Sequence, residues 1–289
     1  MSAEPLTLTR SKPVGYIRRA TAVRSVVQAR PSLQLGKKIP DFWLKSLLPT
    51  ALLIVWEIAS RFEWFDPVFL PRPHLVAKAF YELLFKDRLL VDLRVSAVTV
   101  FAGFSIGAGL GLLTGIGAGL SSTVDKVLGT TLNSIRQVPP LAFLPLIILW
   151  AGAGNAGKIA VISKVVFFPV FMNTLQGIRG VAREYIEVGK IFEYSRLRLL
   201  RKVILPAALP SIFVGIRYGA GMAWSMIIAA EMLGSRRGLG YLLMRSQELL
   251  LTDQLFLVII IIGLVGFAVD VGLRRLESRL LRWRRGFDG

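Results

Sequence analysis

Long apolar stretches separated by short polar segments are the dominant pattern along this chain. A helix needs roughly 20 mostly apolar residues to cross the hydrocarbon core of a bilayer. Six stretches approach that length, and each predicts one membrane-spanning helix. They are residues 43–62, 94–119, 128–150, 158–178, 209–233 and 254–273.

Prolines weaken the first of these predicted spans and break the third. The first contains Pro49 together with the charged Glu57, which makes it the weakest of the six. The third contains Pro139 and Pro140, where a helix must break and leave backbone groups unpaired. Such a break is tolerated in a membrane only where it faces protein or a water-filled cavity.

The second predicted span has a glycine at every fourth position. This period places all of these glycines on one face of the helix, where a second helix can approach closely. The pattern predicts tight helix packing and carries no chemistry of its own. The glycines are Gly103, Gly107, Gly111, Gly115 and Gly119.

Composition and charge support the membrane assignment. The chain of 289 residues is 54% hydrophobic with a mean hydropathy of +0.59, and its net charge is +18. Soluble domains are about 45–50% apolar. In a soluble protein this charge would indicate nucleic-acid binding, whereas basic residues next to a membrane are explained by the anionic inner leaflet. We therefore expect membrane lipid, and no nucleic acid, as a partner.

The distribution of Lys and Arg between the loops predicts the orientation, because cytoplasmic loops carry the excess. With the amino terminus inside, the cytoplasmic pieces hold 23 of these residues and the outer pieces hold 9. The prediction is an all-α, polytopic membrane protein with six transmembrane helices and both termini in the cytoplasm. The inner pieces are 1–46, 120–127, 179–208 and 274–289, and the outer pieces are 61–92, 151–158 and 234–253.

Three segments organise the chain around this membrane domain. Residues 1–42 form a basic cytoplasmic arm, residues 43–273 form the membrane domain, and residues 274–289 form a basic tail. Between the first two spans, residues 66–90 predict a proline-rich turn followed by an amphipathic helix outside the membrane.

Enzyme chemistry finds little support in the sequence. The chain has no Cys and a single His, so we expect no disulfide, no thiolate chemistry and no metal site. The segment GAGNAGKI at 152–159 resembles a phosphate-binding loop, but Ile159 replaces the hydroxyl residue that would hold Mg²⁺. We expect no ATP site there, only a short glycine-rich turn.

Several polar residues lie within the predicted spans, and such residues are costly unless they have a role. Arg136 and Gln137 precede the proline break, and Lys164 lies in the fourth span. Together they predict a positively charged path suited to a small anion. The alternatives are a Lys164 that extends to the membrane surface, and an Arg136 paired with an acidic group or with helix carbonyls.

The fifth span carries two further path candidates, Arg217 and Glu231. Arg217 lies near the cytoplasmic end, and extension of its side chain to the membrane surface is the favoured interpretation. Glu231 lies near the outer face, where it could gate the path or pair with Arg236 or Arg237; pairing is favoured.

A charged stretch, EVGKIFEYSRLRLLRKVILPAALPS at 187–211, separates the fourth and fifth spans. Its charges place a helical run over 182–204 in water, and Pro206 and Pro210 are expected to end that run. A short, rigid helix of this kind is suited to docking a cytoplasmic partner.

This stretch resembles the cytoplasmic signature loop of permease subunits of binding-protein-dependent ABC importers. Their pattern is Glu-Ala-Ala, three residues, Gly, nine residues, then Ile-x-Leu-Pro. The resemblance covers roughly residues 45–275 and points to the branch that carries nitrate, sulfonate, taurine or bicarbonate. Its other segments are LPRP at 70–73, IRQVPPLAFLPLIILWAG at 135–152, GIRYGAGMAW at 215–224, IAAEM at 228–232 and GLGYL at 238–242.

The resemblance implies a type I importer fold in the bacterial inner membrane, a permease domain over 43–273 and a coupling loop over 179–208. It also implies two permease subunits, expected to form a homodimer, with a dimer of cytoplasmic ATPases and an outer substrate-binding protein. ATP and Mg²⁺ would bind the ATPase, leaving this chain without a cofactor. The residues implied to couple it to the ATPase are Glu187, Gly189, Glu193, Arg196, Arg198, Leu205 and Pro206.

Glu193 departs from the family pattern, which has glycine at this position. Because Glu adopts a positive φ only with strain, we expect a more continuous helix here, with Glu193 reaching an ATPase group, Arg196 or Arg198. The expected cargo is a small anion, an aliphatic sulfonate or taurine ahead of nitrate or bicarbonate. An ion-coupled secondary transporter is the alternative from another class, although we find no paired half-helices around a midplane acid.

Overall fold

The computed structural model describes residues 41–85, 89–152 and 154–281, and all regular elements in these ranges are helical. The described residues from 55 onward belong to one compact unit, and residues 41–54, which belong to the first helix, are part of another. The helices are α1 (Asp41–Arg61), α2 (Pro73–Phe85), α3 (Leu89–Leu120), α4 (Ser122–Gln137), η1 (Pro140–Phe143), α5 (Leu144–Ala151), α6 (Asn155–Arg179), α7 (Arg183–Ile191), α8 (Arg196–Leu199), η2 (Leu200–Ile204), α9 (Leu205–Gly234), α10 (Leu239–Glu248) and α11 (Thr252–Leu280).

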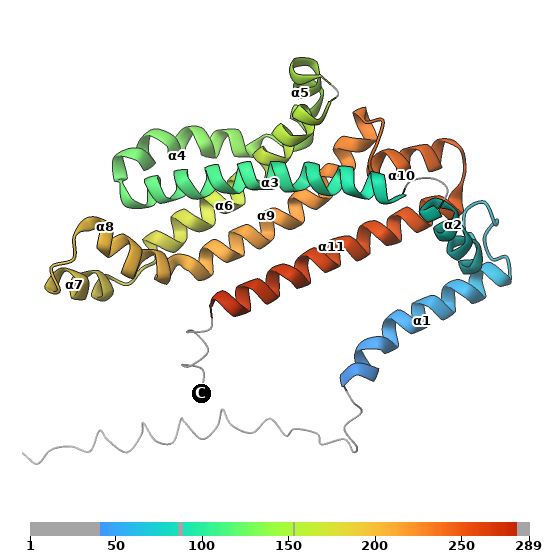
Figure 1. The fold of residues 1–289 in the computed structure, drawn as a ribbon, viewed down its shortest axis with the longest axis horizontal. Helices are drawn as coiled ribbons and strands as arrows, with labels where there is room; N and C mark the ends of the chain where they lie inside the picture. Colours follow the sequence, from blue (N-terminus) through green and yellow to red (C-terminus); the bar gives the residue numbers. More distant parts are fainter. Residues whose placement is uncertain (1–40, 86–88, 153, 282–289) are drawn as a thin grey trace, which may run out of the picture. The chain divides into compact units, whose positions relative to one another are not determined.

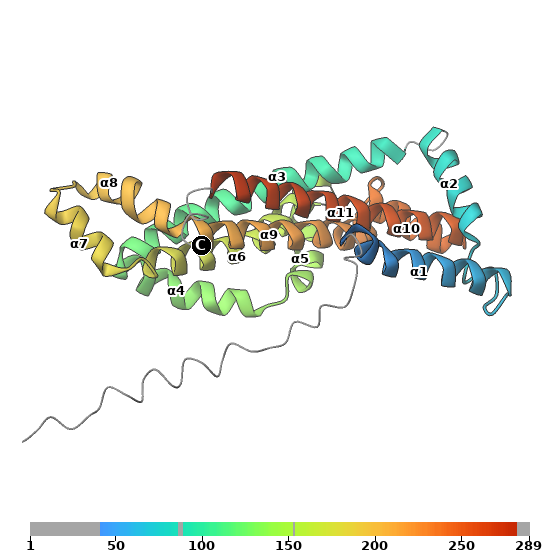
Figure 2. The same ribbon diagram turned by 90° about the horizontal axis from the view of Figure 1, so that it is seen from below.

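Four helical segments are long and apolar enough to cross a membrane: α3, α6, the run that ends in α9, and α11. They coincide with the second, fourth, fifth and sixth predicted spans. α6 packs against both α3 and α9, and α9 packs against α11, so the four run side by side (Figures 1 and 2).

The other two predicted spans do not reach this criterion within the described residues. α1 has 21 residues and contains Pro49. The stretch 128–150 is not one helix, because α4 ends at Gln137, a 3-10 turn follows from Pro140, and α5 is a separate short helix. The proline pair therefore breaks the helix as expected. The number of six spans stays a prediction.

The glycine face of α3 lies directly against α6. A Cβ atom placed on Gly107 would lie 2.4 Å from the carbonyl oxygen of Ser163, and one on Gly111 would lie 2.7 Å from that of Phe167. Gly103, Gly115 and Gly119 are equally close to α6. The hydroxyl of Ser163 donates a hydrogen bond to the carbonyl of Gly103 at 3.1 Å. The two backbones can come this close only because these positions carry no side chain.

α9 is held on its two sides by further close contacts. On the α6 side, the Ser211 hydroxyl donates to the carbonyl of Asn173 at 2.8 Å. On the α11 side, the indole of Trp224 donates to the carbonyl of Ile262 at 2.9 Å. α9 therefore links α6 to α11 in the bundle.

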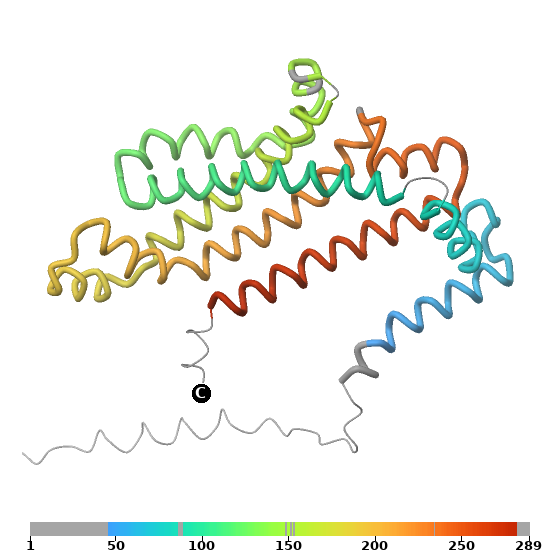
Figure 3. The backbone as a smooth tube through the Cα atoms, in the orientation of Figure 1, coloured from blue at the N-terminus to red at the C-terminus, as the bar shows by residue number. Residues whose placement is uncertain are grey.

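The connections between the long helices lie at two opposite ends. α7 and α8 join α6 to α9 at one end, and α10 joins α9 to α11 at the other (Figure 3). α2, within the predicted 66–90 segment, buries Val76, Ala79 and Leu83 and packs against α11. The turn before α2 is held by the indole of Trp56, which donates a hydrogen bond to the carbonyl of Pro71 at 3.0 Å.

Both predicted basic termini lie largely outside the described residues. Residues 1–40 of the arm and 282–289 of the tail are not described. The part of the tail that is described is helical, because α11 continues through Leu280.

Candidate functional site

Two neighbouring cavities lie where the broken segment after α4 faces α6 and α9. The first, about 310 Å³, is lined by Arg136, Lys164 and residues from both long helices. The second, about 730 Å³, is lined by Arg217 and Asp270 among others. The helix break brings Arg136 and Lys164 together. The residues common to both cavities are Val165, Asn173, Tyr218 and Met222.

Lys164 contacts the backbone that the proline break exposes. Its ammonium donates a hydrogen bond to the carbonyl of Val138 at 3.3 Å and lies 3.4 Å from the ring centroid of Phe143. Both are favourable contacts for a cation away from bulk water. Gln137 is exposed and lines neither cavity.

Arg136 is exposed and forms no ion pair with any residue in the described part of the chain. Neither pairing that the sequence left open for Arg136, with an acidic group or with helix carbonyls, is found among the described residues. The remaining arrangement is an arginine whose side chain lines a cavity with Lys164. A cavity with two cations and no carboxylate in its lining attracts an anion.

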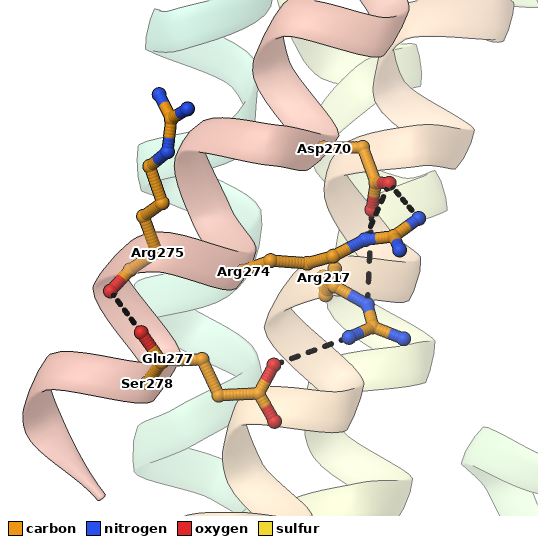
Figure 4. Close-up of polar contacts among 6 residues, drawn as sticks. All are labelled: Arg217, Asp270, Arg274, Arg275, Glu277 and Ser278. Atoms are coloured by element: carbon orange, nitrogen blue, oxygen red, sulfur yellow. Dashed lines mark hydrogen bonds and ion pairs between the residues drawn. The ribbon is translucent and has the colours of Figure 1, made fainter. Parts of the chain in front are cut away.

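Arg217 does not extend freely to a membrane surface, the interpretation favoured from the sequence. Its guanidinium lies 3.1 Å from Glu277 and 3.8 Å from Asp270, both on α11 (Figure 4). Arg274 binds the same Asp270 carboxylate through its Nε at 2.8 Å. The sequence missed this pairing because the carboxylates lie more than fifty positions away and meet Arg217 only through α9–α11 packing.

Glu231 does not pair with Arg236 or Arg237, as the sequence had favoured. Its carboxylate is fully buried and accepts hydrogen bonds from the Ser96 hydroxyl at 2.8 Å and from the Gly240 N–H at 2.9 Å. Ser96 in turn accepts from the N–H of Leu239 at 2.9 Å. Arg237 instead lies 3.9 Å from Asp92.

These contacts hold the first turn of α10, whose leading N–H groups have no partner within the helix. Asp92 accepts from Gly238 at 3.0 Å, so three successive N–H groups are bound by side chains of α3 and α9. Sequence reasoning missed Asp92 and Ser96. Their positions in the sequence could have indicated that they are buried, because their three- to four-residue spacing continues the buried glycine face of α3 toward the start of the helix.

The coupling segment is two helices and not one continuous run, which corrects the expectation for Glu193. α7 ends at Ile191, α8 begins at Arg196, and Glu193 has a φ of 54°. The N–H of Tyr194 donates to the carbonyl of Gly189 at 3.0 Å, and that of Glu193 donates to Lys190 at 2.9 Å. This is a Schellman ending, with Glu193 at the position that favours glycine.

Two local interactions explain why the chain turns at this glutamate. Gly189 is buried, and a Cβ on it would lie 2.5 Å from Leu199, so the two short helices pack closely. The hydroxyl of Ser195 accepts from the N–H of Arg198 and caps α8. No ion pair joins Glu193 to Arg196 or Arg198 in the described residues. Packing and capping therefore impose the turn against the preference of Glu.

Replacing Glu193 with glycine is therefore expected to stabilise the turn. Glycine removes a left-handed strain of about 1 kcal/mol, which corresponds to about fivefold slower opening. Amide hydrogen exchange of Tyr194, whose N–H closes the turn, measures this. The matched control is Glu184→Gly in the first turn of α7, which should accelerate exchange because glycine weakens a helix by about the same amount. Faster exchange in Glu193→Gly would contradict this account.

The prolines do not end the helical run, in contrast to the sequence expectation. The chain stays helical from α8 through η2 into α9, and Pro206 lies in the first turn of α9. η2 is a π-helical turn in which the N–H of Leu205 reaches back five residues to Leu200. The wider turn shifts the bonding register just before Pro206, which has no N–H to donate.

Exposed apolar side chains cover the outer surface of α7 and the turn after it. Among them Ile191 is 79% exposed and Phe192 is 67% exposed, next to the exposed Glu187. A groove beneath this surface is lined by Gly189, Val203 and Pro206 among others. An apolar surface with a charged rim is typical of a protein interface.

Comparison with known proteins gives the same family along most of the chain. The model of the binding-protein-dependent transport system inner membrane component matches residues 107–282. A putative aliphatic sulfonates transport permease protein of Bacillus subtilis is 40% identical over 248 residues, covering 86% of this chain and 90% of its own length. The taurine transport system permease protein of Escherichia coli is 36% identical, with 80% and 86% covered.

Solved structures support the fold. An amino acid ABC transporter matches with a TM-score of 0.54 at 20% identity, covering 72% of this chain and 97% of the other. The MetNI methionine ABC transporter in an inward-facing conformation matches with a TM-score of 0.52 at 17% identity, covering 75% and 99%. At these identities the likeness concerns the fold alone.

Proposed function

The chain belongs to the family of binding-protein-dependent transport system inner membrane components, and from that premise we propose which cargo it carries and by which residues. It is an inner-membrane permease subunit of an ABC importer, with a transport role and not an enzymatic one. Its proposed cargo is a small organic sulfonate such as taurine. The observation that supports this cargo is the 36–40% identity to sulfonate and taurine permeases over most of the chain.

The cavity that holds Arg136 and Lys164 is the proposed path of the anion. A sulfonate carries one negative charge on three oxygens, so it accepts hydrogen bonds from a guanidinium and an ammonium together. The cavity has both donors, and its apolar wall suits the carbon chain of the cargo. Arg217 would contribute less, because Asp270 and Glu277 already neutralise it.

Replacing Lys164 with methionine tests this path. We expect about tenfold slower sulfonate uptake with the protein still folded, because one charge-assisted hydrogen bond is lost while the bulk of the side chain stays. Initial uptake rates in proteoliposomes measure it, with the exposed Lys126→Met on α4 as the control. An uptake rate equal to that of the wild type would mean that Lys164 serves only to hold the helix break.

The partners are part of the same proposal. Two copies of this chain would form the pathway, with the cavities facing their common axis. A dimer of cytoplasmic ATPases, holding ATP and Mg²⁺, would dock on the α7–α8 surface around Glu187 and Ile191. An outer substrate-binding protein would deliver the cargo at the other end. Both termini would then lie in the cytoplasm.

The continuous helical connection through η2 supports a mechanical role for this docking. Because α8, η2 and α9 form one helical run, movement of the docked ATPases would tilt α9 directly. Pro206 at the joint and the π turn allow bending there. Such tilting would open the Arg136–Lys164 cavity to one side of the membrane and then to the other.

The cargo is tested by competition. The complete transporter is supplied with labelled taurine, and unlabelled alkanesulfonate, nitrate or bicarbonate is added in excess. We expect alkanesulfonate to suppress uptake and the two inorganic anions to leave it unchanged. If only nitrate or only bicarbonate suppressed taurine uptake, the cargo of this path would be that inorganic anion and not a sulfonate.

A further inference from the structure

A second group of basic residues lies at the end of the bundle opposite to α7 and α8. Lys158 is in the first turn of α6, and its residue surface is only 7% exposed. Its ammonium donates to the Ser235 hydroxyl at 2.7 Å, which joins the start of α6 to the end of α9. In the described residues no carboxylate lies within ion-pair distance of Lys158. Glu231 attracts this ammonium only from beyond ion-pair distance, and a buried cation that no carboxylate contacts is costly, so a further anion is favoured here.

Two further cavities meet at this end. The first, about 510 Å³, is lined by Lys158, Ser235, Arg236 and the first residues of α6. The second, about 300 Å³, is lined by Arg245 and Gln254 among others. They share Arg236 and Arg237, so the two spaces adjoin.

The carboxylates near these cavities are already engaged. Asp92 accepts from the N–H of Gly238, and Arg237 lies 3.9 Å from it. Glu231 accepts from Ser96 and Gly240 and attracts Lys158 only at longer range. The two cavities therefore have four basic side chains and two nearby carboxylates, Asp92 and Glu231, each of which already accepts a hydrogen bond from the start of α10. The basic side chains are those of Lys158, Arg236, Arg237 and Arg245. The cavities keep an excess of positive charge.

The start of α6 adds donors to the same cavity. Gly154 and Asn155 line it, and no side chain of the described residues caps the first turn of this helix. The leading N–H groups and the positive end of the helix dipole therefore remain available near the Lys158 ammonium. Arg236 belongs to the lining of the same cavity.

We propose that the cavity between Lys158, Ser235 and Arg236 is an oxyanion site that receives the cargo from the outer side before it reaches the Arg136–Lys164 cavity. This inference rests on the proposed function for the identity of the cargo as a sulfonate. The shared chemistry is a tetrahedral oxyanion, which a sulfonate and the phosphodiester of a lipid headgroup both present. The site makes the path a relay of two positive stations in the first half of α6, at Lys158 and Lys164, about 9 Å apart along the helix.

The test uses the complete transporter in proteoliposomes, with labelled taurine at a saturating level of loaded binding protein. Lys158→Met and Arg236→Gln are each expected to slow uptake about tenfold, the factor for one lost hydrogen bond to a charged group. Arg236 is exposed and has no ion pair in the described chain, so its variant isolates the site even where Lys158→Met folds poorly. The control is Arg94→Gln, an exposed arginine of α3 that lines neither cavity.

Three results would overturn the inference. Unchanged uptake by Arg236→Gln removes the site from the path while leaving the sulfonate function intact. An effect that appears in vesicles containing anionic phospholipid, and is absent in purely zwitterionic ones, assigns the site to a lipid headgroup. Equal loss in Arg94→Gln means that general surface charge is responsible. Absence of taurine uptake in the wild type would instead reject the proposed function.

Discussion

Gly107→Val is expected to prevent α3 from packing on α6. A Cβ at this position would lie 2.4 Å from the Ser163 carbonyl oxygen and 2.9 Å from its Cα, and backbone atoms cannot rotate aside. The helices must separate along a contact that runs from Gly103 to Gly119. We expect a loss of about 3 kcal/mol or more, which lowers the unfolding temperature by roughly 10 °C or more and reduces the yield of folded protein.

The measurement is the yield of monodisperse protein in mild detergent together with its thermal unfolding. The matched control is Gly109→Val, on the same helix, where a Cβ would meet no atom within 4 Å. Both variants add the same side chain to the same apolar helix, so they differ only in what that side chain meets. Equal yield and unfolding temperature for the two would contradict the close packing of α3 on α6.

Glu231→Ala is expected to have the second largest effect. It leaves the N–H of Gly240 and the hydroxyl of Ser96 without their buried acceptor, and it removes the carboxylate nearest to Lys158. Loss of buried hydrogen bonds to a charged group costs about 3 kcal/mol. For a unit of this size that lowers the unfolding temperature by roughly 10 °C.

The comparison for Glu231 is Glu248→Ala, an exposed glutamate at the end of α10. Thermal unfolding in detergent should leave this control within about 0.5 kcal/mol of the wild type. Glu231→Gln keeps the shape of the side chain and one acceptor oxygen, so its unfolding temperature should lie between those of Glu231→Ala and Glu248→Ala. An unfolding temperature of Glu231→Ala equal to that of the wild type would mean that the start of α10 is held by other contacts.

The sequence was sufficient for features that depend on local pattern. Four apolar stretches became the long helices, and the four-residue glycine period marked the face on which α3 meets α6. The break at Pro139 and Pro140 could also be predicted, because proline acts on its own helix.

Features that depend on distant partners could not be predicted. Arg217 pairs with Asp270 and Glu277, and Glu231 binds Ser96, over separations that only helix packing brings together. At Glu193 the predicted conformation was wrong, because the packing of the buried Gly189 and the Ser195 cap outweigh the local cost of a positive φ. The prediction for Glu193 rested on the local backbone preference of Glu, whereas tertiary packing determines the conformation that the structure shows.

We propose that this chain transports a sulfonate only as part of an ATP-driven assembly. Taurine uptake into proteoliposomes that contain this permease, with its ATPase and binding protein added singly and together, tests this proposal. We expect uptake only when both proteins and ATP are present, and we expect it to persist after the proton gradient is collapsed. Uptake by the permease alone, driven by an ion gradient and lost when that gradient is collapsed, would refute the proposal.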